Sequence, residues 1–326
     1  VKAKRAAQSC LETPRNHWLP VQSATTSERL ICQLLYFVNM VTESMITFLL
    51  IVASIEARQI QVRRNLGDVC QKMWNAAGNN MVVGTDMTVN TSSTATNLFT
   101  VTSTGQTKLQ QPVYTSFKAL LDNYISDETK PEIPASQKSQ EEDNFINTIA
   151  VEGGPVDIAF KYLKTNGKTT ATDLNAFKAV LKMMWFAKNA KGELRVRDYS
   201  GFKHTFFGVL GVNKEGKTVV KGLHNWYQFL LEQTAGRLAY SPPQKNVDTT
   251  KKPPFINVQF TWNGVSKTQG SSFYVGTSPA FEMALYTACF FGEPGYCTCN
   301  VDRNQLKIKT FNFHNAGMVL TSYPVA

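Results

Sequence analysis

The hydrophobic pattern is clearest in the stretch Ser200–Phe229, where apolar and polar residues alternate on both sides of a polar break at residues 213–216. Two alternating runs around a short break that contains glycine predict two antiparallel strands joined by a turn. After His224 the pattern changes to helical spacing, with apolar residues such as Trp226 on one face. This interpretation puts His204 on the first strand and His224 just after the second, so that both side chains can meet on one surface.

Helical spacing of apolar residues dominates the chain before this stretch. Pro112 and Pro155 stand at positions expected for first helical turns, and Thr172 is a candidate N-cap for the next helix. A stretch rich in Ser, Thr and Asn, residues 85–110, predicts a loop or short strands. The expected helices carry the following apolar residues, which we assign to the core: Val69, Met73 and Trp74; Phe117, Leu120, Leu121 and Tyr124; Phe145, Ile146 and Ile149; Val156, Ala159, Phe160 and Leu163; Leu174, Phe177, Leu181, Met184 and Trp185.

Strand patterns return in the last third of the chain. Ser278 followed by Pro279 predicts the start of a capped helix between the strands. A helical N-terminal half followed by antiparallel β-sheets predicts the α+β fold class. The expected strands are Phe255–Trp262, Phe273–Gly276, Leu306–Phe313 and Met318–Tyr323.

Size and charge narrow the range of partners. The 326 residues are enough for one large domain or two small ones, and the apolar content of 43% is ordinary for a globular protein. There are 34 basic and 24 acidic residues, which give a net charge of +10. Such a charge favours a polyanionic partner, and nucleic acid is the first candidate.

The segment before residue 58 has the pattern of a signal peptide. A short apolar run, Ile46–Ala53, is followed by the small residues Ser54 and Ala57, as expected at a cleavage site. The run is too short to span a bilayer. We therefore expect translation to start at Met40 or Met45.

This interpretation divides the chain into two parts. Residues 1–57 are an upstream extension with a signal peptide, and residues 58–326 form the mature, secreted domain, which has no stable membrane association. The alternative is a membrane anchor formed by residues 31–55. That anchor would place Glu43 near the middle of the bilayer, which is energetically costly.

The mature part retains an even number of cysteines, which permits two disulfides in a secreted protein. Cys297 and Cys299 are too close in sequence to pair easily with each other. No histidine lies near them, which argues against a zinc site. The four cysteines are Cys70, Cys289, Cys297 and Cys299.

The chain contains several longer motifs. They are Ser-Gly-Phe-x-His at 200–204, Phe-x-Gly at 206–208, Leu-His-Asn-Trp-x-Gln-Phe at 223–229, the run from Pro112 to Tyr124, and Phe-Glu-x-Ala-Leu-Tyr-Thr-x-Cys-Phe at 281–290. Together they resemble the EndoU (XendoU) endoribonuclease family over roughly residues 62–326. The resemblance implies cleavage of RNA at uridylates, with a 2′,3′-cyclic phosphate as one product.

Three residues supply the chemistry that RNA cleavage needs. A base must deprotonate the 2′-hydroxyl, a cation must stabilise the charge on phosphorus, and an acid must protonate the leaving 5′-oxygen. Imidazole titrates near neutral pH, so His224 and His204 can be base and acid. By resemblance, His204, His224 and Lys267 match the catalytic trio of the family, and we assign His224 as base and His204 as acid.

The resemblance and the strand pattern add substrate-binding candidates. Ser271 matches a position linked to uracil recognition. Tyr323 can stack on a sugar or base of single-stranded RNA, and Thr321 lies two residues earlier on the same strand face. His314 matches no role in the family and is assigned a structural one.

Two departures from the family concern a metal. Family members carry glutamates beside the first histidine and at the end of the next motif, and these are associated with a manganese response. By resemblance Mn²⁺ is a possible cofactor, but Lys203 and Val209 occupy those places here, which argues against dependence on it. No metal ligands are assigned.

The main prediction is a secreted endoribonuclease acting on single-stranded RNA that contains uridine. The first alternative is a catalytically damped member of the same fold that binds RNA without cutting it, which Lys203 and Val209 favour. The second alternative is a secreted interaction module whose basic face binds glycans. The oligomeric state does not follow from the sequence.

Overall fold

The computed structural model describes residues 26–62, 66–92, 94–128, 130, 135–187, 200–241, 246–313 and 317–326. The chain forms two units, Val1–Arg64 and Asn65–Ala326. Helix α2 (Thr26–Val62) belongs to the first unit, and its apolar side chains such as Phe48 and Leu50 are exposed. Among the helices that the structure describes, none combines the length and the apolar character needed to cross a membrane. The predicted cleavage near Ala57 lies within α2 and remains a prediction.

The first part of the second unit is helical, as the sequence predicts. Pro112 and Pro155 occupy first-turn positions, where a missing N–H costs nothing. The cap of the last of these helices is Asp173 and not Thr172, because the Asp173 carboxylate accepts a hydrogen bond from the Ala176 N–H at 2.8 Å. The helices are α3 (Leu66–Ala77), α4 (Ser103–Leu109), α5 (Pro112–Asp122), α6 (Ala135–Ile149), α7 (Pro155–Thr165) and α8 (Leu174–Phe186).

The polar stretch 85–110 holds one element that its composition does not predict. Two short strands form there, β1 (Met87–Val89) and β2 (Phe99–Val101), in agreement with the prediction. Helix α4 follows them, and the Thr102 hydroxyl caps it by accepting a hydrogen bond from the Gly105 N–H. This helix has only two buried residues, so it leaves almost no apolar pattern in the sequence.

The second half contains the expected antiparallel sheets. One sheet has the order β5-β7-β6, with β8 paired to β7, and another has the order β11-β10-β9. Together with the helical half they confirm the α+β class. The elements are β3 (Val209–Val212), β4 (Thr218–Lys221), α9 (Trp226–Thr234), β5 (Leu238–Tyr240), β6 (Asn246–Asp248), β7 (Phe255–Trp262), β8 (Val265–Tyr274), α10 (Pro279–Gly292), β9 (Tyr296–Val301), β10 (Asn304–Asn312) and β11 (Val319–Pro324).

The predicted hairpin exists as β3 and β4, but its first strand is shorter than expected. Residues Lys203–Phe207 form a π-helical turn, η1, so the prediction of His204 on a strand is wrong. The side chains of η1 other than His204 are buried, which is incompatible with a strand that has one solvated face. Strand β8 also starts at Val265, well before the predicted Phe273, and therefore includes Lys267 and Ser271.

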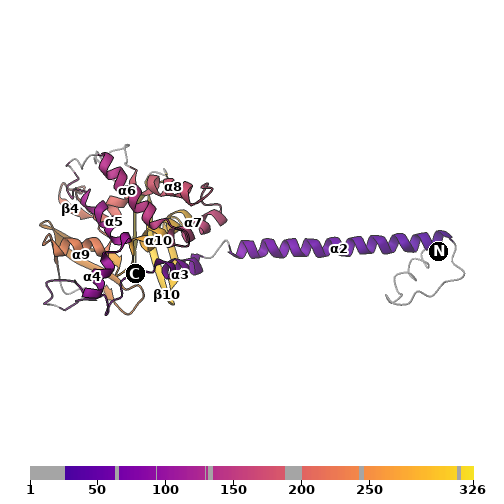
Figure 1. Cartoon of the computed structure of the whole chain (residues 1–326), viewed down its shortest axis with the longest axis horizontal. Helices are drawn as coiled ribbons and strands as arrows, with labels where there is room; N and C mark the ends of the chain where they lie inside the picture. Colours follow the sequence, from indigo (N-terminus) through magenta and orange to yellow (C-terminus); the bar gives the residue numbers. More distant parts are fainter. Residues whose placement is uncertain are drawn as a thin grey trace. The chain divides into compact units, whose positions relative to one another are not determined.

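The two halves share one core. Phe117 on α5 lies 5.6 Å from both Phe202 and Phe206, measured between ring centroids. Helix α10 is buried at every position from Pro279 to Phe290, as expected for a helix that is apolar on all sides. In Figure 1, α6 and α8 lie along the upper edge of this unit and β10 along the lower edge. The core thus fixes η1 and the hairpin against the helical half.

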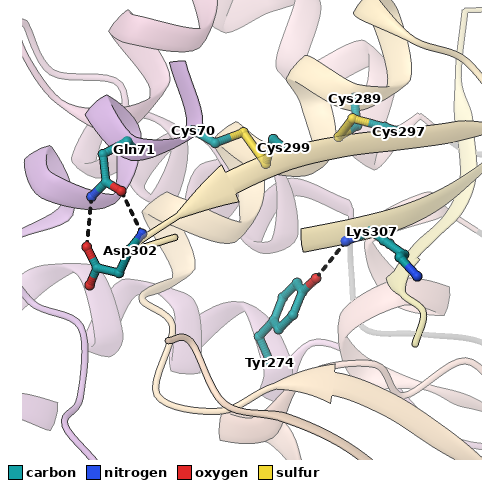
Figure 2. Close-up of a disulfide and its surroundings, with 8 residues drawn as sticks. All are labelled: Cys70, Gln71, Tyr274, Cys289, Cys297, Cys299, Asp302 and Lys307. Atoms are coloured by element: carbon teal, nitrogen blue, oxygen red, sulfur yellow. Dashed lines mark hydrogen bonds between the residues drawn. A yellow bond between two sulfur atoms is a disulfide. The ribbon is translucent and has the colours of Figure 1, made fainter. Parts of the chain in front are cut away.

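Two disulfides fasten strand β9 to neighbouring helices (Figure 2). Cys70 on α3 pairs with Cys299, and Cys289 on α10 pairs with Cys297. Two disulfides and the absence of a Cys297–Cys299 pair agree with the prediction. A bridge of this kind contributes about 2–4 kcal/mol by constraining the unfolded chain. Because β9 pairs with β10, and β10 with β11, the bridges also anchor the strand that carries Tyr323.

Polar contacts hold the two ends of the same sheet (Figure 2). The Gln71 side chain donates to the Asp302 carboxylate at 3.2 Å and accepts from the Asp302 N–H at 2.7 Å. The Lys307 N–H donates to the Tyr274 hydroxyl at 3.2 Å, which joins β10 to the end of β8. Helix α3 and strand β8 therefore position the three-stranded sheet from two sides.

Candidate active site

The centre of the site is a two-residue turn, Gly222-Leu223, between β4 and His224. Both residues have positive φ angles, +67° for Gly222 and +62° for Leu223. Only glycine fits at position 222, because an added Cβ would overlap the carbonyl oxygen of His204. Leucine rarely adopts this conformation, and such strain persists where surrounding contacts over-determine it.

Backbone hydrogen bonds join this turn to η1. The Leu223 N–H donates to the His204 carbonyl at 3.1 Å, and the His224 N–H donates to the Thr205 carbonyl at 2.7 Å. The Thr205 hydroxyl in turn accepts from the Ser322 N–H on β11 at 3.1 Å. Backbone hydrogen bonds thus hold the two histidines close to each other, although they are 20 residues apart in the sequence.

The imidazole of His224 is oriented by β8 and β11. Its Nδ1 lies 3.0 Å from the Ser272 carbonyl oxygen and 3.1 Å from the Ser271 hydroxyl. A carbonyl oxygen only accepts, so Nδ1 carries the proton and Nε2 of the neutral ring is the proton acceptor. The ring stacks on Tyr323, with centroids 4.5 Å apart and planes inclined by 15°.

Strand β8 brings a lysine and a serine to the same turn. The Lys267 ammonium donates to the Gly222 carbonyl. The Ser271 hydroxyl donates to the Leu223 carbonyl at 2.6 Å and is 1% exposed. The turn before His224 therefore accepts hydrogen bonds from both residues, and Lys267 is fixed close to the histidine pair.

Burial changes the protonation of all three catalytic candidates. Burial, followed by the charges of Lys267 and Lys221, lowers the pKa of His204 to about 3. Burial and then Lys267 also place the pKa of His224 well below its usual value. Burial lowers the pKa of Lys267 to about 7. At neutral pH both imidazoles of the free protein are neutral, and Lys267 is poised between its charged and neutral forms.

These groups border a pocket of about 640 Å³. His224, Lys267 and Tyr323 line it, whereas His204, Ser271 and Thr321 are not among its lining residues. None of the described residues in the lining contributes a carboxylate side chain, so the pocket suits an anion. The lining also includes Asn213, Lys221, Asn257, Thr268, Gln269 and Ser272.

The structure separates the predicted substrate residues by accessibility. Tyr323 is half-buried and faces the pocket. Ser271 uses its hydroxyl within the protein, and the buried Oγ1 of Thr321 has no hydrogen-bond partner among the residues that the structure describes. His314 lies outside the described residues.

Several residues of the site were missed by the sequence analysis. Gly222 and Leu223 form the turn, Thr205 and Ser272 hold His224, and Lys221 lines the pocket. A glycine directly after a strand and two positions before a histidine was the available signal for the turn. The others act through backbone atoms or become neighbours only in the fold.

The residues present do not fit a manganese site. Lys203 is 1% exposed and Val209 is fully buried, and neither carries an oxygen ligand. Within the described part of the chain, no group of three His, Cys, Asp or Glu side chains is arranged to hold a metal ion.

Comparisons with known proteins agree with this geometry. A family model described as endoribonuclease XendoU matches residues 65–324. Uridylate-specific endoribonuclease B of Danio rerio is 29% identical over 278 residues, which cover 80% of this chain and 96% of that protein. Uridylate-specific endoribonuclease of Paralichthys olivaceus is 34% identical over 208 residues, which cover 64% of this chain and 52% of that protein.

A solved structure shows the same fold. It is described as the structure of XendoU, a splicing-independent snoRNA-processing endoribonuclease, and it matches with a TM-score of 0.64 and 26% identity. The match covers 80% of this chain and 96% of that chain. The region matched by the family model includes His204, His224 and Lys267 together with every element that positions them. The chain therefore belongs to the XendoU family of endoribonucleases.

Proposed function

We propose that this protein cleaves single-stranded RNA at uridylates and leaves a 2′,3′-cyclic phosphate. The observation that carries the proposal is the Gly222-Leu223 turn, which joins His204, His224 and Lys267 beside one pocket. Relatives named uridylate-specific and poly(U)-specific endoribonucleases support the choice of uridine.

The proposed reaction is an in-line exchange at phosphorus. The 2′-oxygen forms a bond to phosphorus and gives its proton to Nε2 of His224. The bond from phosphorus to the 5′-oxygen breaks, and His204 donates a proton to that oxygen. In the transition state the phosphate gains charge, which the Lys267 ammonium stabilises.

The protonation states of the free protein suit the base but not yet the acid. His224 is neutral, as a base must be, and Ser272 fixes its tautomer. His204 must gain a proton before it can act as the acid. An RNA phosphate in the pocket adds negative charge beside His204, which favours the imidazolium form. Substrate binding thus prepares the acid.

A fluorogenic oligonucleotide with a single uridine tests the proposal. We expect His204→Ala, His224→Ala and Lys267→Ala each to lower cleavage at least about a hundredfold, the scale of one acid–base or charge-stabilising group. Lys217→Ala, on the exposed end of the hairpin, is the control and should cut at the wild-type rate. The reaction is run with EDTA throughout, because Lys203 and Val209 offer no metal ligands.

Three outcomes separate the alternatives. A cyclic phosphate end, with no cutting when uridine is replaced by 2′-deoxyuridine, supports 2′-hydroxyl attack. Binding of the oligonucleotide without cutting by the wild type would favour the damped RNA-binding protein. A variant lacking both histidines that cuts at the wild-type rate would rule the mechanism out.

We also propose that the mature protein is secreted. Support comes from the apolar run Ile46–Ala53 and from the two disulfides, which persist mainly in oxidising compartments.

A further inference from the structure

Lys221 is the last residue of β4, directly before the Gly222-Leu223 turn. Its side chain is 26% exposed and lines the pocket. The neighbouring Gly222 carbonyl accepts the hydrogen bond from the Lys267 ammonium. The wall of the pocket therefore carries two ammonium groups beside the histidine pair.

Among the described residues, the ion-pair partner of Lys221 is Glu128, in the loop after α5. The Lys221 ammonium lies 3.3 and 3.4 Å from the two carboxylate oxygens. Charge-assisted hydrogen bonds are usually about 2.7–2.9 Å long, so this contact uses only part of the donor capacity of Lys221. The same carboxylate accepts from the Val212 N–H at 3.1 Å, which fixes it to the hairpin.

The lack of a side chain at Gly211 leaves space for the contact between Glu128 and Lys221. A Cβ at Gly211, which is paired with Val219 across the hairpin, would overlap the Glu128 carboxylate and press on the Lys221 ammonium. Glu128 therefore restrains the long lysine side chain before any ligand arrives.

The position of Lys221 fits a second phosphate. RNA carries one phosphate for each nucleotide, and the proposed reaction places the scissile one between the histidines and Lys267. The charge of Lys221 acts on His204, where it is the second charge to lower the pKa after Lys267. A cation this near the catalytic pair is within reach of the RNA backbone on one side of the scissile phosphate.

We propose that Lys221 binds the RNA phosphate that flanks the scissile one, so that the pocket holds two phosphates of one strand. The inference rests on the proposed function, because it requires RNA in this pocket. It makes the substrate an oligonucleotide with at least one phosphate beyond the cleaved linkage. A purely structural Lys221 would instead only tie the Glu128 loop to the hairpin.

The contact between Lys221 and the flanking phosphate is tested by changing the lysine and the phosphate separately and together. The probe is a short, fluorescently labelled RNA whose single uridine is 2′-deoxy, so that it binds without being cut. Each phosphate flanking the scissile linkage is replaced in turn by a neutral methylphosphonate. Fluorescence anisotropy then gives Kd for the wild type and for Lys221→Gln.

We expect Lys221→Gln to weaken binding of the all-phosphate RNA about tenfold, the scale of one hydrogen bond to a charged group. The slope of log affinity against log salt should become shallower by about 0.7, the value for one phosphate contact on a single strand. One methylphosphonate position should abolish the difference between the two proteins. Lys217→Gln, on the exposed end of the same hairpin, should show no such coupling at any position.

Glu128→Gln provides a second, independent measurement. Glutamine keeps an acceptor for the Val212 N–H but removes the anion that competes for Lys221. We expect the all-phosphate RNA to bind severalfold more tightly, and the coupled methylphosphonate RNA to bind as it does to the wild type. Thermal unfolding of each variant checks that the hairpin is intact.

The outcomes distinguish this inference from the proposed function. If Lys221→Gln weakens all probes equally, or weakens none, the flanking-phosphate site is wrong while uridine cleavage can still stand. If the wild type neither binds nor cuts uridine-containing RNA, the proposed function fails and this site fails with it.

Discussion

The substitution Ser271→Ala distinguishes two roles for one hydroxyl. By family resemblance Ser271 reads uracil, whereas in the structure its hydroxyl donates to the Leu223 carbonyl and lies 3.1 Å from Nδ1 of His224. We expect the variant to lose catalytic rate because His224 loses an orienting partner. We expect its preference for uridine over cytidine to be preserved.

The magnitude follows from the contacts that the hydroxyl makes. Ser271 is 1% exposed, so its removal leaves the Leu223 carbonyl buried and one acceptor of His224 Nδ1 missing. A buried polar group left without its partner costs about 1–3 kcal/mol of stability. Misplacement of a catalytic group by a fraction of an ångström lowers the rate, and we expect a loss of about ten- to a hundredfold in kcat.

The assay compares two fluorogenic substrates that differ only in one base, uridine or cytidine. Ser278→Ala is the matched control, because Ser278 is also a fully buried serine that accepts a backbone hydrogen bond, at the start of α10. It should lower stability by about 1 kcal/mol, as loss of an N-cap does, and leave cleavage unchanged. Thermal unfolding of both variants separates lost stability from lost chemistry.

The result that would refute the positioning role is a collapse of base preference. If Ser271→Ala cuts cytidine as fast as uridine while kcat at uridine stays at the wild-type value, Ser271 reads the base. An equal loss of cleavage rate with the uridine and the cytidine substrate, together with an altered pH–rate profile, is the result expected for a displaced His224.

Two further predictions concern charge and processing. The pKa of Lys267 is lowered to about 7, so its ammonium is present below that pH and lost above it. We expect kcat/KM to fall more steeply once the pH rises above about 7, and in Lys267→Arg this additional fall should move to higher pH because guanidinium stays protonated. An unmoved alkaline limb would show that another group titrates. Expression from Met40 or Met45 in a secretory cell should give a protein that begins between Ile55 and Gln59, and retention of the apolar segment in a membrane fraction would favour the anchor instead.

Local signals in the sequence were sufficient for much of the fold. Proline at the first turn of α5 and α7, and Ser278 before Pro279 at α10, act through neighbouring backbone groups and so can be recognised without a fold. The alternation around residues 213–216 predicted the β3–β4 hairpin for the same reason. The catalytic candidates followed from motif resemblance, which the family match supports.

Predictions failed where burial on all sides removed the pattern. Around His204 the neighbouring side chains are buried, so η1 has no solvent-exposed face and its spacing resembled a strand. Helix α4 was not predicted for the opposite reason: only Gly105 and Leu109 are buried in it, so it has almost no apolar face. The periodicity of apolar residues indicates an element only when one of its faces is exposed to solvent and the other is buried.

The sequence by itself determined which side chains are available for the chemistry. It also determined that a mainly helical half precedes most of the strands along the chain, and that residues 58–326 hold an even number of cysteines. Only the tertiary structure decided that Gly222 packs on His204, that Ser271 holds the turn before His224, and that Lys221 enters the same pocket. It also decided the protonation of Lys267, whose pKa falls because the fold buries it. Burial and contact depend on segments far apart in the chain, so no local pattern carries them.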